Sequence, residues 1–286
     1  MQAAAWLLAA ALLAPAAFAQ DAAALRAHHA ALQDKLASNV FGRPLALEST
    51  QTAGDLKGDV YTVVDHPFGT VQQALHSIEH WCDILILHLN VKRCKADAGA
   101  KTIALNVGRK FDQRLEDAYQ LDFDFRVAAA TADYLQVQLD ADQGPMGTKN
   151  YRIVVEAIPL DAKKSVIHMS YAYGYGMAAK LAIQAYLTTL GSKKVGFTTN
   201  GKSADGQPVY IGGVLGLLER NTMRYYLAID AYLSAQSLPP ADRVERRMRS
   251  WHASTERYAR QLREMDQDDY LEMKRKEIRR QQGQQG

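Results

Sequence analysis

Residues 102–175 alternate between apolar and polar side chains through five short runs that turns separate. The odd positions carry apolar or aromatic side chains: Ile103, Leu105, Val107, Tyr119, Leu121, Phe123, Phe125, Val127, Leu135, Val137, Leu139, Tyr151, Ile153, Val155, Ile167, Met169, Tyr171, Tyr173 and Tyr175. Polar residues stand between them: Asn106, Gln120, Asp122, Asp124, Arg126, Gln136, Gln138, Arg152 and Glu156. A period of two predicts strands with one dry and one wet face. The short connections predict an antiparallel meander.

Helical sequence flanks this block on both sides. Apolar residues at three- and four-residue spacing predict two short helices over 68–89, bent near Trp81. Two further helices follow the block, over 177–190 and over 212–233, and the second is the more apolar. Upstream, 22–37 reads as a helix, and 45–49 and 59–64 read as strands. The sequence therefore predicts an α+β fold.

The first residues resemble an export signal. An apolar run from Ala3 to Ala14 is followed by Pro15 and by Ala17-Phe18-Ala19, a small-x-small cleavage site. We expect cleavage before Gln20 and a secreted or periplasmic protein with no transmembrane segment after cleavage. The alternative is a short membrane anchor that is never cleaved.

The chain contains two cysteines, Cys82 and Cys94. An oxidising compartment would let them pair, so the expected export favours a disulfide. Two buried thiols are the alternative.

The net charge of +3 lies in the C-terminal region. Residues 242–280 hold twelve Lys or Arg and nine Asp or Glu, which leaves 22 of each sign in the rest of the chain. A neutral body argues against nucleic acid as a partner. For this tail we favour a solvated helix rich in internal ion pairs, and docking to a protein partner is the second interpretation.

The order of strand, helix pair, antiparallel strands and long C-terminal helix resembles the helix-grip fold of the START-like superfamily, which includes Bet v 1-like proteins. Such a fold implies a curved antiparallel sheet that grips a long C-terminal helix. It also implies a cavity between them that holds an apolar or amphipathic molecule. The predicted parts are a signal peptide (1–19), a helix and linker (20–44), a START-like domain (45–235), a charged helical tail (236–280) and a disordered end (281–286).

Tyrosines gather where this cavity is expected. The predicted ligand-binding residues are Tyr171, Tyr173, Tyr175, Tyr186, Arg224 and Tyr225. Buried tyrosines combine an apolar ring with a hydroxyl that needs a partner, which suits a pocket wall. The alternative for each is an ordinary core position, and for Arg224 an internal ion pair or a side chain that reaches to water.

One motif points to zinc chemistry instead. His76, Glu79 and His80 match H-x-x-E-H, and Glu156 is the candidate third ligand. Two exposed histidines on a helix are the alternative interpretation.

The leading hypothesis is thus a binding or carrier protein for a hydrophobic small molecule or lipid, with no catalytic residue and no cofactor. A cyclase- or hydrolase-like enzyme that uses the same cavity is the second hypothesis. A zinc-dependent hydrolase is the third.

Overall fold

The computed structural model describes residues 14–189 and 191–283. Eight strands form a single antiparallel sheet in the order β1-β2-β8-β7-β6-β5-β4-β3. Their bounds are β1 Leu45–Gln51, β2 Asp55–Val64, β3 Val91–Asp97, β4 Thr102–Val107, β5 Tyr119–Ala130, β6 Leu135–Gln143, β7 Thr148–Pro159 and β8 Ser165–Tyr175. The predicted five-strand meander is confirmed as β4 to β8.

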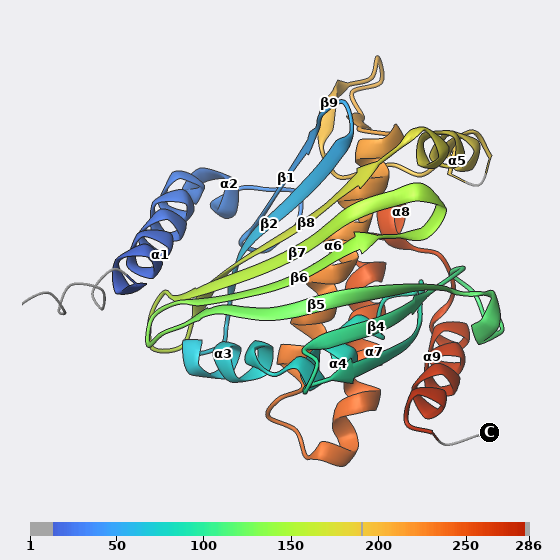
Figure 1. Ribbon diagram of the computed structural model, residues 1–286. Helices are drawn as coiled ribbons and strands as arrows, with labels where there is room; N and C mark the ends of the chain where they lie inside the picture. Colours follow the sequence, from blue (N-terminus) through green and yellow to red (C-terminus); the bar gives the residue numbers. More distant parts are fainter. Residues whose placement is uncertain (1–13, 190, 284–286) are drawn as a thin grey trace, which may run out of the picture.

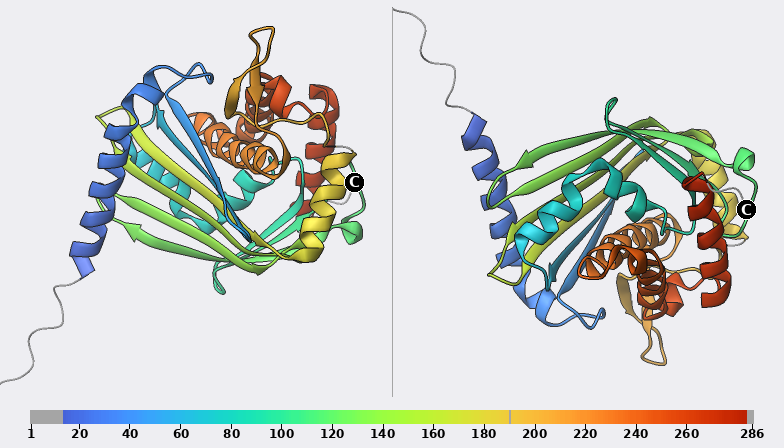
Figure 2. Two further views of the ribbon diagram at one scale, coloured as in Figure 1. Left: turned by 90° about the horizontal axis from the view of Figure 1, so that it is seen from above. Right: turned by 90° about the horizontal axis from the view of Figure 1, so that it is seen from below.

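The alternating residues divide between a buried and an exposed face of the sheet, as expected. On β5, Leu121, Phe123 and Phe125 are buried, while the intervening Asp122 and Asp124 are exposed. Register shifts interrupt the β3–β4, β5–β6 and β7–β8 pairings. Because such irregularities bend strands, the sheet curves, and Figures 1 and 2 show it wrapped around one long helix.

That long helix is α6 (Gly213–Ser234), which lies on the concave face. It crosses β2 at Gly58, where a β-carbon would collide with Thr222. The absence of a side chain there lets helix and sheet approach closely. The predicted grip of a curved antiparallel sheet on a long C-terminal helix, and with it the START-like fold, is confirmed.

The helix pair before the meander is α3 (Phe68–His76) and α4 (Ile78–Leu85). The break lies at Ser77, whose backbone is extended, and not near Trp81 as predicted. Helix α4 also ends before Leu89. Strand β3 follows and was not predicted, because Val91-Lys92-Arg93-Cys94 carries charge where an ordinary strand would be apolar.

Cys82 of α4 and Cys94 of β3 form a disulfide, as expected. Both residues are buried. The disulfide therefore joins the helix pair to the edge strand of the sheet.

Helices α1 (Ala14–Ala31) and α2 (Gln33–Ala37) lie on the convex face. A second core forms there between Leu25 of α1, Leu36 of α2 and the intervening Leu32 on one side and Tyr61 and Val166 of the sheet on the other. The predicted signal peptide at 1–19 falls largely outside the described residues, and its cleavage stays a prediction. Among the described residues, no helix combines the length and apolar character that a membrane crossing requires.

After the sheet come α5 (Met177–Thr188) and a small hairpin formed by β9 (Thr199–Lys202) and β10 (Pro208–Tyr210). The C-terminal region then forms α7 (Pro240–Glu256), α8 (Ala259–Leu262) and α9 (Gln267–Gln281). Short turns η1 (Leu115–Asp117) and η2 (Pro145–Gly147) complete the elements.

The prediction of a solvated tail helix is wrong. Trp251, Leu262 and Tyr270 are almost fully buried, and they belong to the main core. The narrow apolar stripe of this region packs against the domain because α7 lies on α6 and α9 lies on β3. Of the predicted disordered end, Gln281 is helical, and 284–286 lie outside the described residues.

Candidate ligand-binding site

Four tyrosine rings form a continuous surface between the sheet and α6. Tyr151 of β7 stacks on Tyr173 of β8 with a centroid distance of 5.3 Å. Tyr171 lies 5.5 Å from Tyr173 and 5.1 Å from Tyr225 of α6. We call Tyr151, Tyr171, Tyr173 and Tyr225 the tyrosine wall. It joins the two elements between which the fold implies a ligand.

Three hydroxyls of the tyrosine wall are unpaired. Tyr151 donates its hydroxyl hydrogen to Thr148 Oγ1 at 2.9 Å. Burial raises the pKa values of Tyr171, Tyr173 and Tyr225, and no described residue hydrogen-bonds to their hydroxyls. These three groups are therefore neutral donors. None of the three hydroxyl oxygens is among the fully buried atoms that lack a partner, so each retains access to solvent or to a ligand.

His88 extends the wall from the other side of α6. Its ring stacks on Tyr225 at 4.6 Å, and its Nδ1 accepts a hydrogen bond from the Asn90 N–H at 3.1 Å. Burial, reinforced by the charge of Arg224, lowers the pKa of His88 well below its ordinary value. The ring is thus neutral with its proton on Nε2. This Nε2 is buried and has no partner among the described residues.

Two arginines lie one helical turn apart on α6 and are fully buried. Arg224 Nη2 donates to Leu262 O at 3.2 Å and to Glu264 Oε1 at 2.8 Å. Arg220 Nη1 donates to Val195 O at 3.4 Å. Nε and Nη1 of Arg224, and Nε and Nη2 of Arg220, have no partner among the described residues.

Glu264 is the acceptor that these cations share. Its carboxylate contacts Arg224, Lys110 Nζ at 2.6 Å and Lys194 Nζ at 3.1 Å. We call Arg220, Arg224, Lys110, Lys194 and Glu264 the basic cluster. Burial, together with the charge of Arg224, lowers the pKa of Lys110 to about 8. Burial is the larger cause, and the positive charge of Arg224 adds to it while Glu264 opposes it.

Helix α5 covers this end of the molecule. Of its side chains only Ala179 is buried, and Met177 and Leu181 are largely exposed. Tyr186 on α5 is half-buried, and Lys110 Nζ lies 5.8 Å from its ring centroid. In Figure 2, α5 lies at the end of the sheet beside the C-terminal helices. It is attached to the rest of the fold by little buried surface.

The structure thus brings most of the predicted ligand-binding residues into two adjoining groups. Tyr171, Tyr173 and Tyr225 belong to the tyrosine wall, and Arg224 belongs to the basic cluster with Tyr186 nearby. Tyr175 lies apart at the end of β8, where its hydroxyl accepts a hydrogen bond from Gln51 Nε2 at 2.9 Å. Arg224 makes an internal ion pair and does not reach to water.

Sequence reasoning missed Tyr151, His88, Arg220, Lys110 and Glu264. One signal was present for Arg220, because two arginines four residues apart on an apolar helix share one face. Lys110 and Glu264 lie in connecting segments far apart in the chain. Only the packing of α8 against α6 brings them together.

The zinc interpretation does not fit the structure. The extended backbone at Ser77 separates His76, at the end of α3, from His80 in α4, so the motif does not lie on one helix. Glu156 lies on the convex face, where it contacts His168 Nδ1 at 2.6 Å and accepts a hydrogen bond from Tyr134. Helix α3 packs on the concave face, so the sheet separates Glu156 from both histidines.

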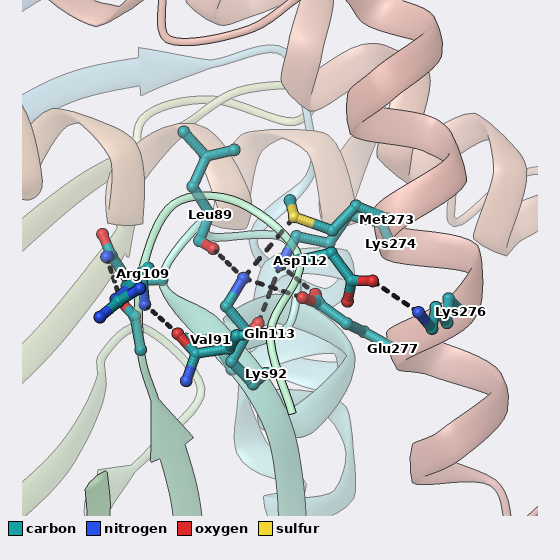
Figure 3. Close-up of polar contacts among 12 residues, drawn as sticks. Leu89, Val91, Lys92, Arg109, Asp112, Gln113, Met273, Lys274, Lys276 and Glu277 are labelled. Atoms are coloured by element: carbon teal, nitrogen blue, oxygen red, sulfur yellow. Dashed lines mark hydrogen bonds and ion pairs between the residues drawn. The ribbon is translucent and has the colours of Figure 1, made fainter. Parts of the chain in front are cut away.

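Figure 3 shows a second buried charged group for comparison, formed by Lys92, Lys274 and Glu277. Lys92 Nζ donates to Leu89 O and Glu277 Oε1, and Lys274 Nζ donates to two backbone carbonyls and to Glu277 Oε2. We call these three residues the lysine network. None of their side-chain nitrogens or oxygens lacks a partner, so this network is structural, in contrast to the basic cluster.

Two hollows in the described part of the chain lie away from the tyrosine wall. One, of about 320 Å³, is lined by Asn39, Phe41 and Leu45 together with Phe197 and Thr198. The other, of about 70 Å³, lies between α4 and α9. The cavity that the fold implies between sheet and helix stays a prediction.

Comparisons with known proteins reach the level of fold only. No family model matches the chain, and no curated protein matches it. Similar solved structures include a START superfamily protein from Mycobacterium smegmatis, at 11% identity and a TM-score of 0.31 over 49% of this chain and 93% of that one. Truncated norcoclaurine synthase from Thalictrum flavum matches at 12% identity and a TM-score of 0.35, over 49% and 88%. A conserved protein from Geobacillus kaustophilus matches at 11% and 0.36, over 62% and 95%. At these values the likeness says nothing about a ligand or a reaction.

Proposed function

We propose that this chain is a binding or carrier protein for a small hydrophobic molecule, which it holds against the tyrosine wall between β8 and α6. One observation carries the proposal: four tyrosine rings contact one another between β7, β8 and α6, and no described residue hydrogen-bonds to the hydroxyls of Tyr171, Tyr173 or Tyr225. A ligand with an apolar body and a few acceptors would satisfy them and contact the rings.

Access to the wall is the second part of the proposal. Helix α5 buries a single side chain among those described, so its displacement exposes little apolar surface to water. Helix α6, by contrast, is buried along most of its length. We therefore assign the opening to α5. Amide hydrogen exchange in α5 is expected to slow when a ligand is bound.

The test uses N-phenyl-1-naphthylamine, a neutral apolar fluorophore. We expect it to bind the purified protein with increased fluorescence, and to bind roughly tenfold more weakly to Tyr225→Leu, which removes the ring contacts to Tyr171 and His88. Tyr119→Leu is the control, because Tyr119 is largely exposed on β5. Absence of probe binding by the wild type, together with no co-purified molecule in native mass spectrometry, would refute the proposal.

We further propose that the protein is exported. The N-terminal apolar run and its cleavage pattern support this, and so does the disulfide, because disulfides persist mainly in oxidising compartments. When the full chain is expressed in a bacterium, the intact mass of the periplasmic protein should correspond to a chain that begins at Gln20. Recovery of the uncleaved chain in the cytoplasmic fraction alone would contradict export.

A further inference from the structure

The unpaired groups of the site share one chemical property. The Nε2–H of His88, and Nε and Nη nitrogens of Arg220 and Arg224, are all donors, and all are buried without a partner among the described residues. The tyrosine hydroxyls nearby can donate as well as accept hydrogen bonds. A site with more buried donors than acceptors is complementary to a group that only accepts hydrogen bonds.

Charge leads to the same conclusion independently of the hydrogen-bond inventory. Lys110, Lys194 and Arg224 contact the carboxylate of Glu264, and Arg220 lies one turn from Arg224 on α6. Glu219, also on α6, is a second carboxylate near Arg220, so four cations face two carboxylates. The oxygens of Glu219 accept hydrogen bonds from Ser49, from the Phe197 and Thr198 N–H groups and from the Thr198 hydroxyl. The cluster therefore retains positive charge in a region of low dielectric, where an additional anion is strongly favoured.

His88 links the basic cluster to the tyrosine wall, because consecutive helix residues such as Arg224 and Tyr225 point in different directions. Tyr225 contacts Tyr171 and His88, while Arg224 contacts Glu264. His88 lies close enough to Arg224 and Lys110 for their charges to lower its pKa. One ligand can thus place an apolar body on the wall and a polar end at the arginines.

We infer that the ligand is an amphipathic anion, whose carboxylate, sulfonate or phosphate group binds Arg220 and Arg224 while its apolar body lies on the tyrosine wall. This inference rests on the proposed function, because it names the class of molecule that the same site takes. Glu264 is then an internal competitor that holds Arg224 and Lys110 in place and weakens the binding of a second anion. Arginine is suited to binding the anionic group of the ligand, because its guanidinium forms paired hydrogen bonds to planar or tetrahedral oxyanions.

Two fluorophores with the same aromatic body distinguish the contribution of the anionic group to binding from that of the tyrosine wall. N-phenyl-1-naphthylamine is neutral, and 8-anilinonaphthalene-1-sulfonate carries one sulfonate. The measured quantity is the ratio of their affinities for each variant. We expect Arg224→Gln to shift the ratio roughly tenfold against the sulfonate, since a hydrogen bond to a charged group is lost. We expect Glu264→Gln to shift it in the opposite direction.

Arg249→Gln is the control, because Arg249 is 49% exposed in an ordinary surface pair with Glu245. The ratio should stay at the wild-type value in this variant. Failure of Arg224→Gln to fold leaves the test intact, because Glu264→Gln must still favour the sulfonate. Equal affinities for both probes in wild type and in Glu264→Gln would overturn the inference while leaving the proposed function in place.

Binding of neither probe, together with no co-purified molecule in native mass spectrometry, would refute the proposed function itself. A separate titration with inorganic phosphate distinguishes a free anion from an amphipathic one. Thermal stabilisation by phosphate, with no binding of either probe, would make the cluster a site for a free anion and would overturn the inference. Displacement of the sulfonate probe by a medium-chain fatty acid, but not by the corresponding alcohol, would support it.

Discussion

Glu277→Gln is expected to lower the free energy of unfolding by about 3–5 kcal/mol, the usual cost when one partner of a buried ion pair is removed. Glu277 Oε1 lies 2.9 Å from Lys92 Nζ, and Oε2 lies 2.7 Å from Lys274 Nζ. All three side chains are fully buried. The substitution leaves two ammonium groups in a low-dielectric region without a counter-charge.

The pKa of Lys274 already indicates that burial disfavours its charged form. Burial lowers it to about 8 even though Glu277 opposes the shift. With Glu277 replaced, we expect the pKa of Lys274 to fall further, so that the variant recovers part of its stability as the pH rises above 8. The sign follows because the unfolded chain then binds more protons than the folded one. Chemical denaturation at pH 7 and pH 9 measures both effects.

Asp112→Asn is the matched control for this charge removal. Asp112 pairs with Lys276, which lies on α9 as Glu277 does, but both side chains are about half exposed. Exposed pairs contribute about 0–1 kcal/mol, so this variant should unfold close to the wild type. Similar unfolding midpoints for Glu277→Gln and Asp112→Asn would show that the lysine network is not the element that holds α9 to β3.

The strands could be predicted because their physical signal is local. Alternation along β5, with Phe123 and Phe125 inward and Asp122 and Asp124 outward, depends only on the side-chain period of an extended chain. The apolar run of α6 is likewise visible in the sequence. Strand β3 gave no such signal, because Lys92 occupies a fully buried position that only Glu277, far along the chain, makes tolerable.

The site residues likewise divide into those with a local signal in the sequence and those without one. The tyrosines of β8 could be placed on one face from their spacing, and Arg224 was conspicuous on an apolar helix. The partner of Arg224 could not be predicted, because Glu264 reaches it only through the fold of 263–266 between α8 and α9. The tail was misread for a related reason. Its charged composition is typical of a solvated helix, yet Lys274 and Glu277 are charges that tertiary contacts bury.

The disulfide gives the second large expected effect. The double variant Cys82→Ala/Cys94→Ala should lower the free energy of unfolding by about 3 kcal/mol in the chain-entropy model for a loop of this length. The two cysteines are 12 residues apart. Under reducing conditions the wild type should lose comparable stability, whereas the double variant should be unaffected by the reductant. An equal response of both proteins to the reductant would contradict the assignment of a disulfide between Cys82 and Cys94.

The two large effects converge on β3, the last strand of the sheet. Cys94 ties this strand to α4, while Lys92, two residues earlier, ties it to α9. Contacts that hold the same element are coupled, so their free energies are not expected to add. If β3 detaches as a unit once either attachment is lost, the combined variant with Glu277→Gln should be less destabilised than the sum of the separate changes. Strict additivity in chemical denaturation would mean that α4 and α9 stabilise β3 independently.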